Sequence, residues 1–460
     1  MQDKNELFAS APVPRAVATM AIPTVLSMLV TVVYNMVDTF FVGQTGDANQ
    51  VAAVSLATPV FLIIMAMGNI FGLGGGAAIS RFLGMGARER VKTISSFCFY
   101  ASLAVGAVLV AVLLTGMPAV LQLIGTSANT VDFAREYLFV IALGAPLTLT
   151  GGALTNLVRA EGAAREAMFG MMLGTVINIV LDPLMILTFG WGVAGAAIAT
   201  VIGNGSTLVY YLLYFTRRKS ILSISPKAFA LRGVYGTVLS IGLPASVNTL
   251  LLSLANIILN NFLSFYGDAA VAAMGVAMKA NMLVVFVQIG LAAGVQPLIG
   301  YNFGAKNFAR MKAVMKFTMI CTVTLGLSLT ALYFIATEPI IRAFIADETV
   351  VTYGVHMLRA LMLSGPFLGV LFVFMNALQA MGQAIPSLVL SISRQGFLFL
   401  PLLIVLNAVL QLNGIVYAQP IADLCSIALA CALFVRSERR LRRAHESESD
   451  ASASQPVVQG

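Results

Sequence analysis

The feature that most constrains this chain is a series of long apolar stretches that runs from residue 16 to residue 435. Only 10% of its 460 residues are charged, whereas soluble domains have roughly a quarter. A helix needs about 20 predominantly apolar residues to cross a bilayer, and about twelve stretches meet that length. They predict an all-α polytopic membrane protein with spans near 16–42, 51–78, 93–117, 133–157, 167–189, 193–216, 235–265, 269–300, 313–336, 352–379, 386–410 and 413–435.

The sequence also repeats itself after about 220 residues. Pro23 matches Pro244, and Gly46-Asp47-Ala48 matches Gly267-Asp268-Ala269. Each half has an even number of spans, so both halves enter the membrane from the same side and the repeat is parallel. Such repeats are typical of secondary transporters, which bind substrate between the halves and alternate access by rocking one half against the other. We therefore predict two pseudo-symmetric six-helix bundles.

The distribution of basic residues predicts the orientation and the domain boundaries. Most of the 27 Lys and Arg residues lie in loops on the same side as the N-terminus, which by the positive-inside rule is the cytoplasmic side. Because the basic residues are scattered over many short loops, we do not expect the protein to bind nucleic acid. The expected divisions are a cytoplasmic N-terminus (1–15), an N-lobe (16–216), a cytoplasmic linker (217–234), a C-lobe (235–436) and a disordered cytoplasmic tail (437–460).

Three carboxyl groups lie well inside predicted spans: Asp38, Asp182 and Asp423. A carboxylate there is costly and usually serves a function. Counting residues from the ends of the spans places Asp38, Asp182 and Thr200 at one depth, very roughly 8–12 Å below the outer surface. The alternative is that Asp38 and Asp182 cap broken helices or bond to neighbouring helices.

Each of the first two acids has a polar partner one helical turn away. Tyr34 precedes Asp38 and Asn178 precedes Asp182, and this i,i+4 spacing puts each pair on one helix face. Pro183 adds a free carbonyl, because proline removes the hydrogen bond to the residue four positions earlier. Such oxygen ligands, offered by Asp38, Asp182, Asn178 and Thr200, suit a hard cation such as Na⁺. Alternatively, the two neighbouring carboxyl groups form a proton carrier.

The second half carries polar residues with two open interpretations. A substrate cavity and helix-to-helix hydrogen bonds are both consistent with Asn256, Asn260, Met278, Asn376 and Gln379. Asp423 is either an additional coupling residue or a structural one. Three basic residues lie inside predicted spans, and two roles are open for them: to neutralise an anionic group, or to snorkel and form structural ion pairs. They are Lys279, Arg359 and Arg394.

Several motifs resemble the multidrug and toxic compound extrusion (MATE) family, and within it the MepA-like bacterial branch. The resemblance extends to about residue 436 and rests on Ile22-Pro23, Val37-Asp38-Thr39-Phe40-Phe41-Val42-Gly43, Arg159-Ala160-Glu161-Gly162, Asn178-Ile179-Val180-Leu181-Asp182-Pro183, Gly192-Val193-Ala194-Gly195-Ala196-Ala197 and Ala418-Gln419-Pro420-Ile421-Ala422-Asp423. It implies export of amphipathic or cationic drug-like compounds across the bacterial inner membrane in exchange for H⁺ or Na⁺. The implied cation site consists of Tyr34, Asp38, Asn178, Asp182 and Thr200.

The sequence departs from some branches of this family, which carry essential acids in helices seven and ten. Here those helices hold Asn256, Asn260 and Asn376 instead, which favours coupling through the first half alone. A flippase for a lipid-linked precursor is the alternative, although few intramembrane bases are available to bind its phosphates. An enzyme is not expected, since the two histidines, His356 and His445, form no HExxH motif and no nucleophile elbow is present. No ATP-binding loop and no cofactor other than the coupling ion are expected.

Overall fold

The computed structural model describes residues 2–216, 220–345 and 347–453. Within them, 11 helices are long and apolar enough to cross a membrane, or up to 12 if a bent pair counts as one span. The N-lobe contains α1 (Gln2–Ala9), α2 (Val13–Gly43), α3 (Ala48–Gly84), α4 (Arg88–Thr115), α5 (Met117–Leu123), α6 (Val131–Ala160), α7 (Ala164–Asp182), the π-helix η1 (Pro183–Thr188) and α8 (Gly192–Thr216).

The C-lobe follows a linker with one short 3₁₀ turn, η2 (Pro226–Ala228). Its elements are α9 (Tyr235–Ser264), α10 (Asp268–Gly304), α11 (Phe308–Ile335), α12 (Thr337–Arg342), α13 (Glu348–Leu361), α14 (Gly365–Ala380), α15 (Ala384–Ile392), the π-helix η3 (Ser393–Leu398), α16 (Phe399–Leu410) and α17 (Leu412–Ala453). Helix starts recur 220 residues apart, at Ala48 and Asp268 and again at Arg88 and Phe308. The duplication seen in the sequence is therefore a duplication of structure.

Two segments differ from the sequence prediction. The span expected at 352–379 is broken between α13 and α14, which meet at an angle of 49°. Pro366 lies in the first turn of α14 and has no backbone N–H to continue the helix before it. The predicted disordered tail is also helical as far as Ala453, because Arg, Glu and Ala favour helix there and Glu438 pairs with Lys312 of α11. Residues 454–460 lie outside the described residues.

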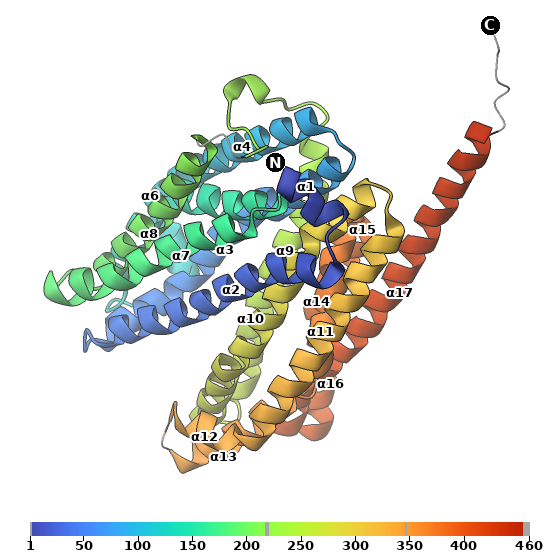
Figure 1. Ribbon diagram of the computed structural model, residues 1–460. Helices are drawn as coiled ribbons and strands as arrows, with labels where there is room; N and C mark the ends of the chain where they lie inside the picture. Colours follow the sequence, from blue (N-terminus) through green and yellow to red (C-terminus); the bar gives the residue numbers. More distant parts are fainter. Residues whose placement is uncertain (1, 217–219, 346, 454–460) are drawn as a thin grey trace, which may run out of the picture.

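The two lobes meet near one face of the molecule and diverge away from it (Figure 1). We call the meeting side the basic face, because it carries the Lys- and Arg-rich turns after α3 and α10. The N-terminal segment and the linker lie on the same side. The main contacts between the lobes pair α2 with α10 and α3 with α9. From there the N-lobe extends to the α7–α8 turn and the C-lobe extends to α12 and α13 (Figure 1).

Glycines allow the backbones of the two lobes to touch at the basic face. A Cβ on Gly84 of α3 would lie 1.9 Å from the carbonyl oxygen of Tyr301, and a Cβ on Gly304 of α10 would lie 2.0 Å from that of Arg81. The two contacts are reciprocal, since the four positions are related by the 220-residue repeat. We call them the glycine crossing. Only glycine permits this approach, as in other close helix crossings.

The linker is fastened to the N-lobe. The carboxylate of Glu161, which is completely buried, accepts hydrogen bonds from the Ser220 hydroxyl and the Ile221 amide, each at 2.9 Å. The hydroxyl of Tyr100 on α4 donates to the Ile224 carbonyl at 3.0 Å. Phe229 packs edge-on against the same tyrosine ring. Residues 220–229 therefore form part of the N-lobe, although they follow its last helix.

Candidate functional site

The candidate ion site lies in the N-lobe, where α2, α7 and α8 come together. Asp38 is near the end of α2 that is distant from the basic face, and Asp182 is the last residue of α7. Because Pro183 cannot continue the α-helical hydrogen bonding, the chain winds on as the π-helix η1. π-Helical turns occur frequently at functional sites.

Hydrogen bonds join three of the five predicted residues. The Asn178 side-chain amide donates to the Thr200 hydroxyl at 3.4 Å, and the Tyr34 hydroxyl lies 3.4 Å from the same oxygen. Asn178 and Thr200 are buried, at 3% and 7% exposure. Residues from three helices, α2, α7 and α8, therefore meet in one cluster.

Asp182 is the most unusual member of this cluster. Its side chain is completely buried, and neither carboxylate oxygen has a hydrogen-bond partner; the carbonyl oxygen of the Asn178 side chain is likewise unpartnered. Asp38 is half-buried and close enough to Asp182 for the two carboxyl groups to interact electrostatically. A buried acceptor without a donor costs about 1–3 kcal/mol, and more when it is charged. The cluster therefore has more acceptors than donors, which fits a bound cation.

The donor set is consistent with a hard cation or a proton. Two carboxyl groups, an amide oxygen and hydroxyl oxygens are ligands typical of such ions. Among the described residues no group of three or more His, Cys, Asp and Glu side chains comes together. The ligands that the cluster offers are therefore oxygen atoms from two carboxyl groups, an amide and hydroxyls.

Sequence reasoning missed Tyr137 of α6. Its half-buried phenol lies close enough to both Asp38 and Asp182 to be influenced by their charges. No signal in the sequence indicates this, because no acidic residue lies three or four positions from Tyr137 in its own helix. The packing of α6 against α8 brings it to the site.

Asp423 lies in the other lobe and is already paired. Its carboxylate accepts hydrogen bonds from the Arg394 guanidinium at 3.0 Å, the Gln419 amide at 2.9 Å and the Ser364 hydroxyl at 3.2 Å. The Arg394 guanidinium also lies over the Phe372 ring, 5.2 Å from its centre. Both charges are therefore satisfied without an added ion.

The other C-lobe candidates do not form a comparable cluster in the described structure. Asn376 donates to the Phe372 carbonyl of its own helix at 2.9 Å, and Gln379 accepts from Gln296 of α10 at 3.3 Å. The rest are spread over α9 and α10: Asn256 and Met278 are half-buried, and Asn260 and Lys279 are exposed. Their role in substrate binding stays a prediction.

Comparisons with known proteins agree with this architecture. The MatE family model matches twice, over residues 23–184 and 244–411, once in each lobe. The multidrug export protein MepA of Staphylococcus aureus is 31% identical over 94% of this chain and 96% of its own length, and that of Staphylococcus saprophyticus is equally similar.

Solved structures support the same fold. The structure of a multidrug resistance MATE family transporter in an outward-facing conformation aligns with a TM-score of 0.90 and 24% identity, covering 97% of this chain and 99% of that one. These comparisons do not favour the flippase alternative, and the family is one of transporters rather than enzymes. The family model and the MepA relatives show that the chain belongs to the MATE family of multidrug efflux transporters.

Proposed function

We propose that this protein exports amphipathic, cationic organic compounds across the bacterial inner membrane in exchange for H⁺ or Na⁺ bound at Asp38 and Asp182. The observation that carries the proposal is the completely buried Asp182 carboxylate, whose two oxygens have no hydrogen-bond partner. A bound cation supplies the missing positive charge. Its release leaves two adjacent carboxyl groups that repel each other, so the empty site favours rearrangement.

The arrangement of the lobes supports alternating access. By the positive-inside rule the basic face is cytoplasmic. The lobes meet at this face and diverge from it (Figure 1), so this arrangement corresponds to an outward-open state. The duplicated lobes and the reciprocal glycine crossing suit a rocking motion in which the contacts at the basic face open and the opposite ends close.

The test is gradient-driven transport of a fluorescent organic cation in proteoliposomes, with an imposed pH or Na⁺ gradient. We expect Asp182→Asn and Asp38→Asn to abolish uphill transport, because an amide cannot exchange the ion. Asp132→Asn is the matched control, since this acid is exposed and forms its ion pair with Arg135 of the same helix. Transport that survives in both site variants would overturn the ion-site assignment. Absence of gradient-driven transport in the parent protein would overturn the exporter assignment.

One further variant distinguishes the two ions. Asn178→Ala removes an unpartnered amide oxygen from the cluster. If the ion is Na⁺, this loss of a ligand raises the Na⁺ concentration that half-saturates transport. If the ion is H⁺, transport keeps its dependence on the pH gradient, because the carboxyl groups that carry the proton are intact.

A further inference from the structure

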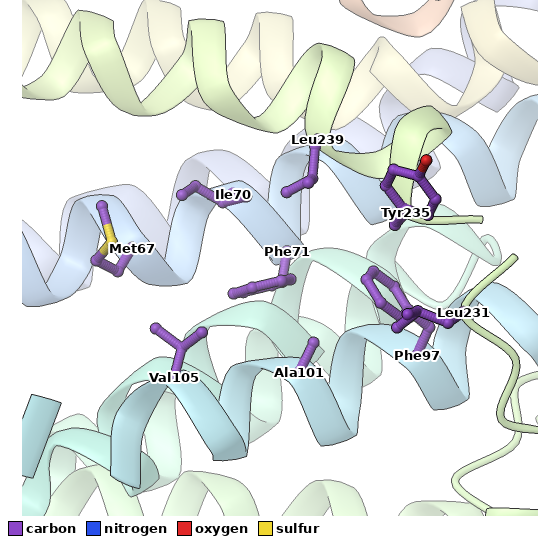
Figure 2. Close-up of a pocket in the computed structure, with 9 residues that line it drawn as sticks. All are labelled: Met67, Ile70, Phe71, Phe97, Ala101, Val105, Leu231, Tyr235 and Leu239. Atoms are coloured by element: carbon purple, nitrogen blue, oxygen red, sulfur yellow. The ribbon is translucent and has the colours of Figure 1, made fainter. Parts of the chain in front are cut away.

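An apolar pocket lies apart from the ion site, beside the contact between the lobes. It is a pocket of about 520 Å³ between α3, α4, the linker and the beginning of α9 (Figure 2). The linker residue Leu231 and the first residue of α9, Tyr235, place one end of the pocket at the basic face. Its volume falls within the range of roughly 300–1,000 Å³ that is typical of ligand sites. The lining residues are Met67, Ile70, Phe71, Phe97, Ala101, Val105, Leu231, Tyr235 and Leu239.

The pocket is elongated along the two helices that form its walls. Figure 2 shows the lining side chains in rows along α3 and α4, with Leu231 and Tyr235 at one end. Phe97 and Val105 are eight residues apart on α4, so this wall is roughly 12 Å long. The hydrocarbon core of one leaflet is about 15 Å thick. The pocket therefore has the length and direction of an acyl chain that enters from the leaflet on the basic face.

The walls and the rim differ in chemistry. Ile70, Phe71 and Phe97 are buried and form the inner wall, whereas Leu231 and Tyr235 at the rim are more than half exposed. The Tyr235 phenol is the single polar side chain of the lining, and its hydroxyl points away from the pocket (Figure 2). Tyrosine is enriched at the membrane–water interface. The interior thus offers a charged ligand no partner, and the rim lies where a lipid headgroup lies.

The charged residues of the linker that borders the rim are all basic. Arg232 follows Leu231 directly, and Lys227 lies in the same linker; both side chains are exposed. The sequence from 217 to 235 contains no acidic residue. A cationic drug is repelled at this rim, whereas an anionic headgroup is attracted. Charge complementarity therefore selects an anionic lipid over the compounds that the transporter exports.

We propose that this pocket binds an acyl chain of an anionic phospholipid from the leaflet on the basic face, with its phosphate near Arg232 and Lys227. A lipid acyl chain in this pocket contacts both lobes, because α3 and α4 belong to the N-lobe and Leu239 belongs to the C-lobe. The contact between α3 and α9 is adjacent, where a Cβ on Gly74 would lie 2.2 Å from the Val238 carbonyl oxygen. The lipid thus joins the lobes in this arrangement, and its site changes when they move.

Tryptophan quenching by brominated lipid tests this proposal without a transport assay. The chain has one tryptophan, so Trp191→Phe gives a silent background. Tyr235→Trp then reports on the rim of the pocket, and Phe169→Trp is the matched control on α7, since the two native side chains are 53% and 52% exposed. Each reporter is reconstituted into nanodiscs in which phosphatidylglycerol with brominated chains is titrated into unlabelled phosphatidylcholine.

We expect half-maximal quenching of the Tyr235→Trp reporter at a mole fraction lower than for the control by about fivefold or more, the effect of one or two basic residues near an anionic surface. Adding Lys227→Gln and Arg232→Gln removes this difference, and so does Ala101→Phe, which fills the pocket. Equal quenching of the two reporters in the parent background would overturn the proposal, since it indicates contact with bulk lipid only. Equal affinity for brominated phosphatidylcholine, or displacement by tetraphenylphosphonium, would also overturn it.

Discussion

The glycine crossing makes a sharp prediction about the equilibrium between conformations. In Gly304→Ala the new Cβ would lie 2.0 Å from the Arg81 carbonyl oxygen, whereas ordinary contacts begin at 3.4 Å. The backbones of α3 and α10 must therefore separate by about 1.4 Å, the difference between these distances. Over-packing of this kind costs about 1–3 kcal/mol. It acts only on the arrangement in which the crossing is closed, so it shifts the conformational equilibrium about 5–150-fold.

The assay is a distance measurement by pulsed electron paramagnetic resonance. The four native cysteines are replaced, and spin labels are placed at Gln44 after α2 and Phe265 after α9, which are exposed and distant from the basic face in opposite lobes. In the parent protein we expect a predominant long distance. In Gly304→Ala we expect the population at short distance to grow, because the opposite ends close when the crossing opens.

Gly275→Ala on the same helix is the matched control. A Cβ there would meet nothing within 4 Å, so this variant gains the same helix propensity, about 1 kcal/mol, without a clash. If Gly304→Ala and Gly275→Ala give the same distance distribution as the parent, the crossing does not control the equilibrium. If both variants shift it equally, the cause is helix propensity rather than the contact between the lobes.

Three further predictions concern single groups. Glu161→Ala leaves the buried linker amide of Ile221 without its acceptor, so we expect a loss of about 1–3 kcal/mol, seen as a lower melting temperature; an unchanged melting temperature would refute this role. Asp423→Asn leaves the Arg394 charge buried and unpaired, which costs about 3–5 kcal/mol, whereas an apolar replacement of both partners recovers most of the stability; a double-mutant cycle with no coupling energy would contradict this. Tyr137→Phe removes the phenol near both site carboxyl groups, so we expect weaker coupling-ion dependence with intact folding; unchanged ion dependence would exclude Tyr137 from the site.

The elements that could be predicted from the sequence are those that follow from counting along the chain. The spans follow from length and hydropathy, and the repeat follows from matched landmarks. The expectation that Asp38, Asp182 and Thr200 share one depth follows from the rise per residue of a helix. The pairing of Asn178 with Thr200 needed only one further assumption, that neighbouring helices at equal depth face each other.

Features that depend on how helices are rotated and which helices are neighbours could not be predicted. Tyr137 reaches the ion site because α6 packs against α8, and helix rotation has no signature in one sequence. Arg394 and Asp423 were both candidates, but their pairing requires that η3 lie beside α17. The break before Pro366 depends on local geometry, since other prolines, such as Pro146, lie inside continuous helices.

The way the linker is fastened limits how far the lobes can travel. Since residues 220–229 are held by Glu161, Tyr100 and neighbouring side chains of the N-lobe, the free tether comprises only residues 230–234. Five residues span at most about 18 Å when fully extended. The start of α9 therefore stays within this distance of the fastened part of the linker. The contacts at the basic face can open only as far as the tether allows, whereas no such tether restricts the opposite ends of the lobes.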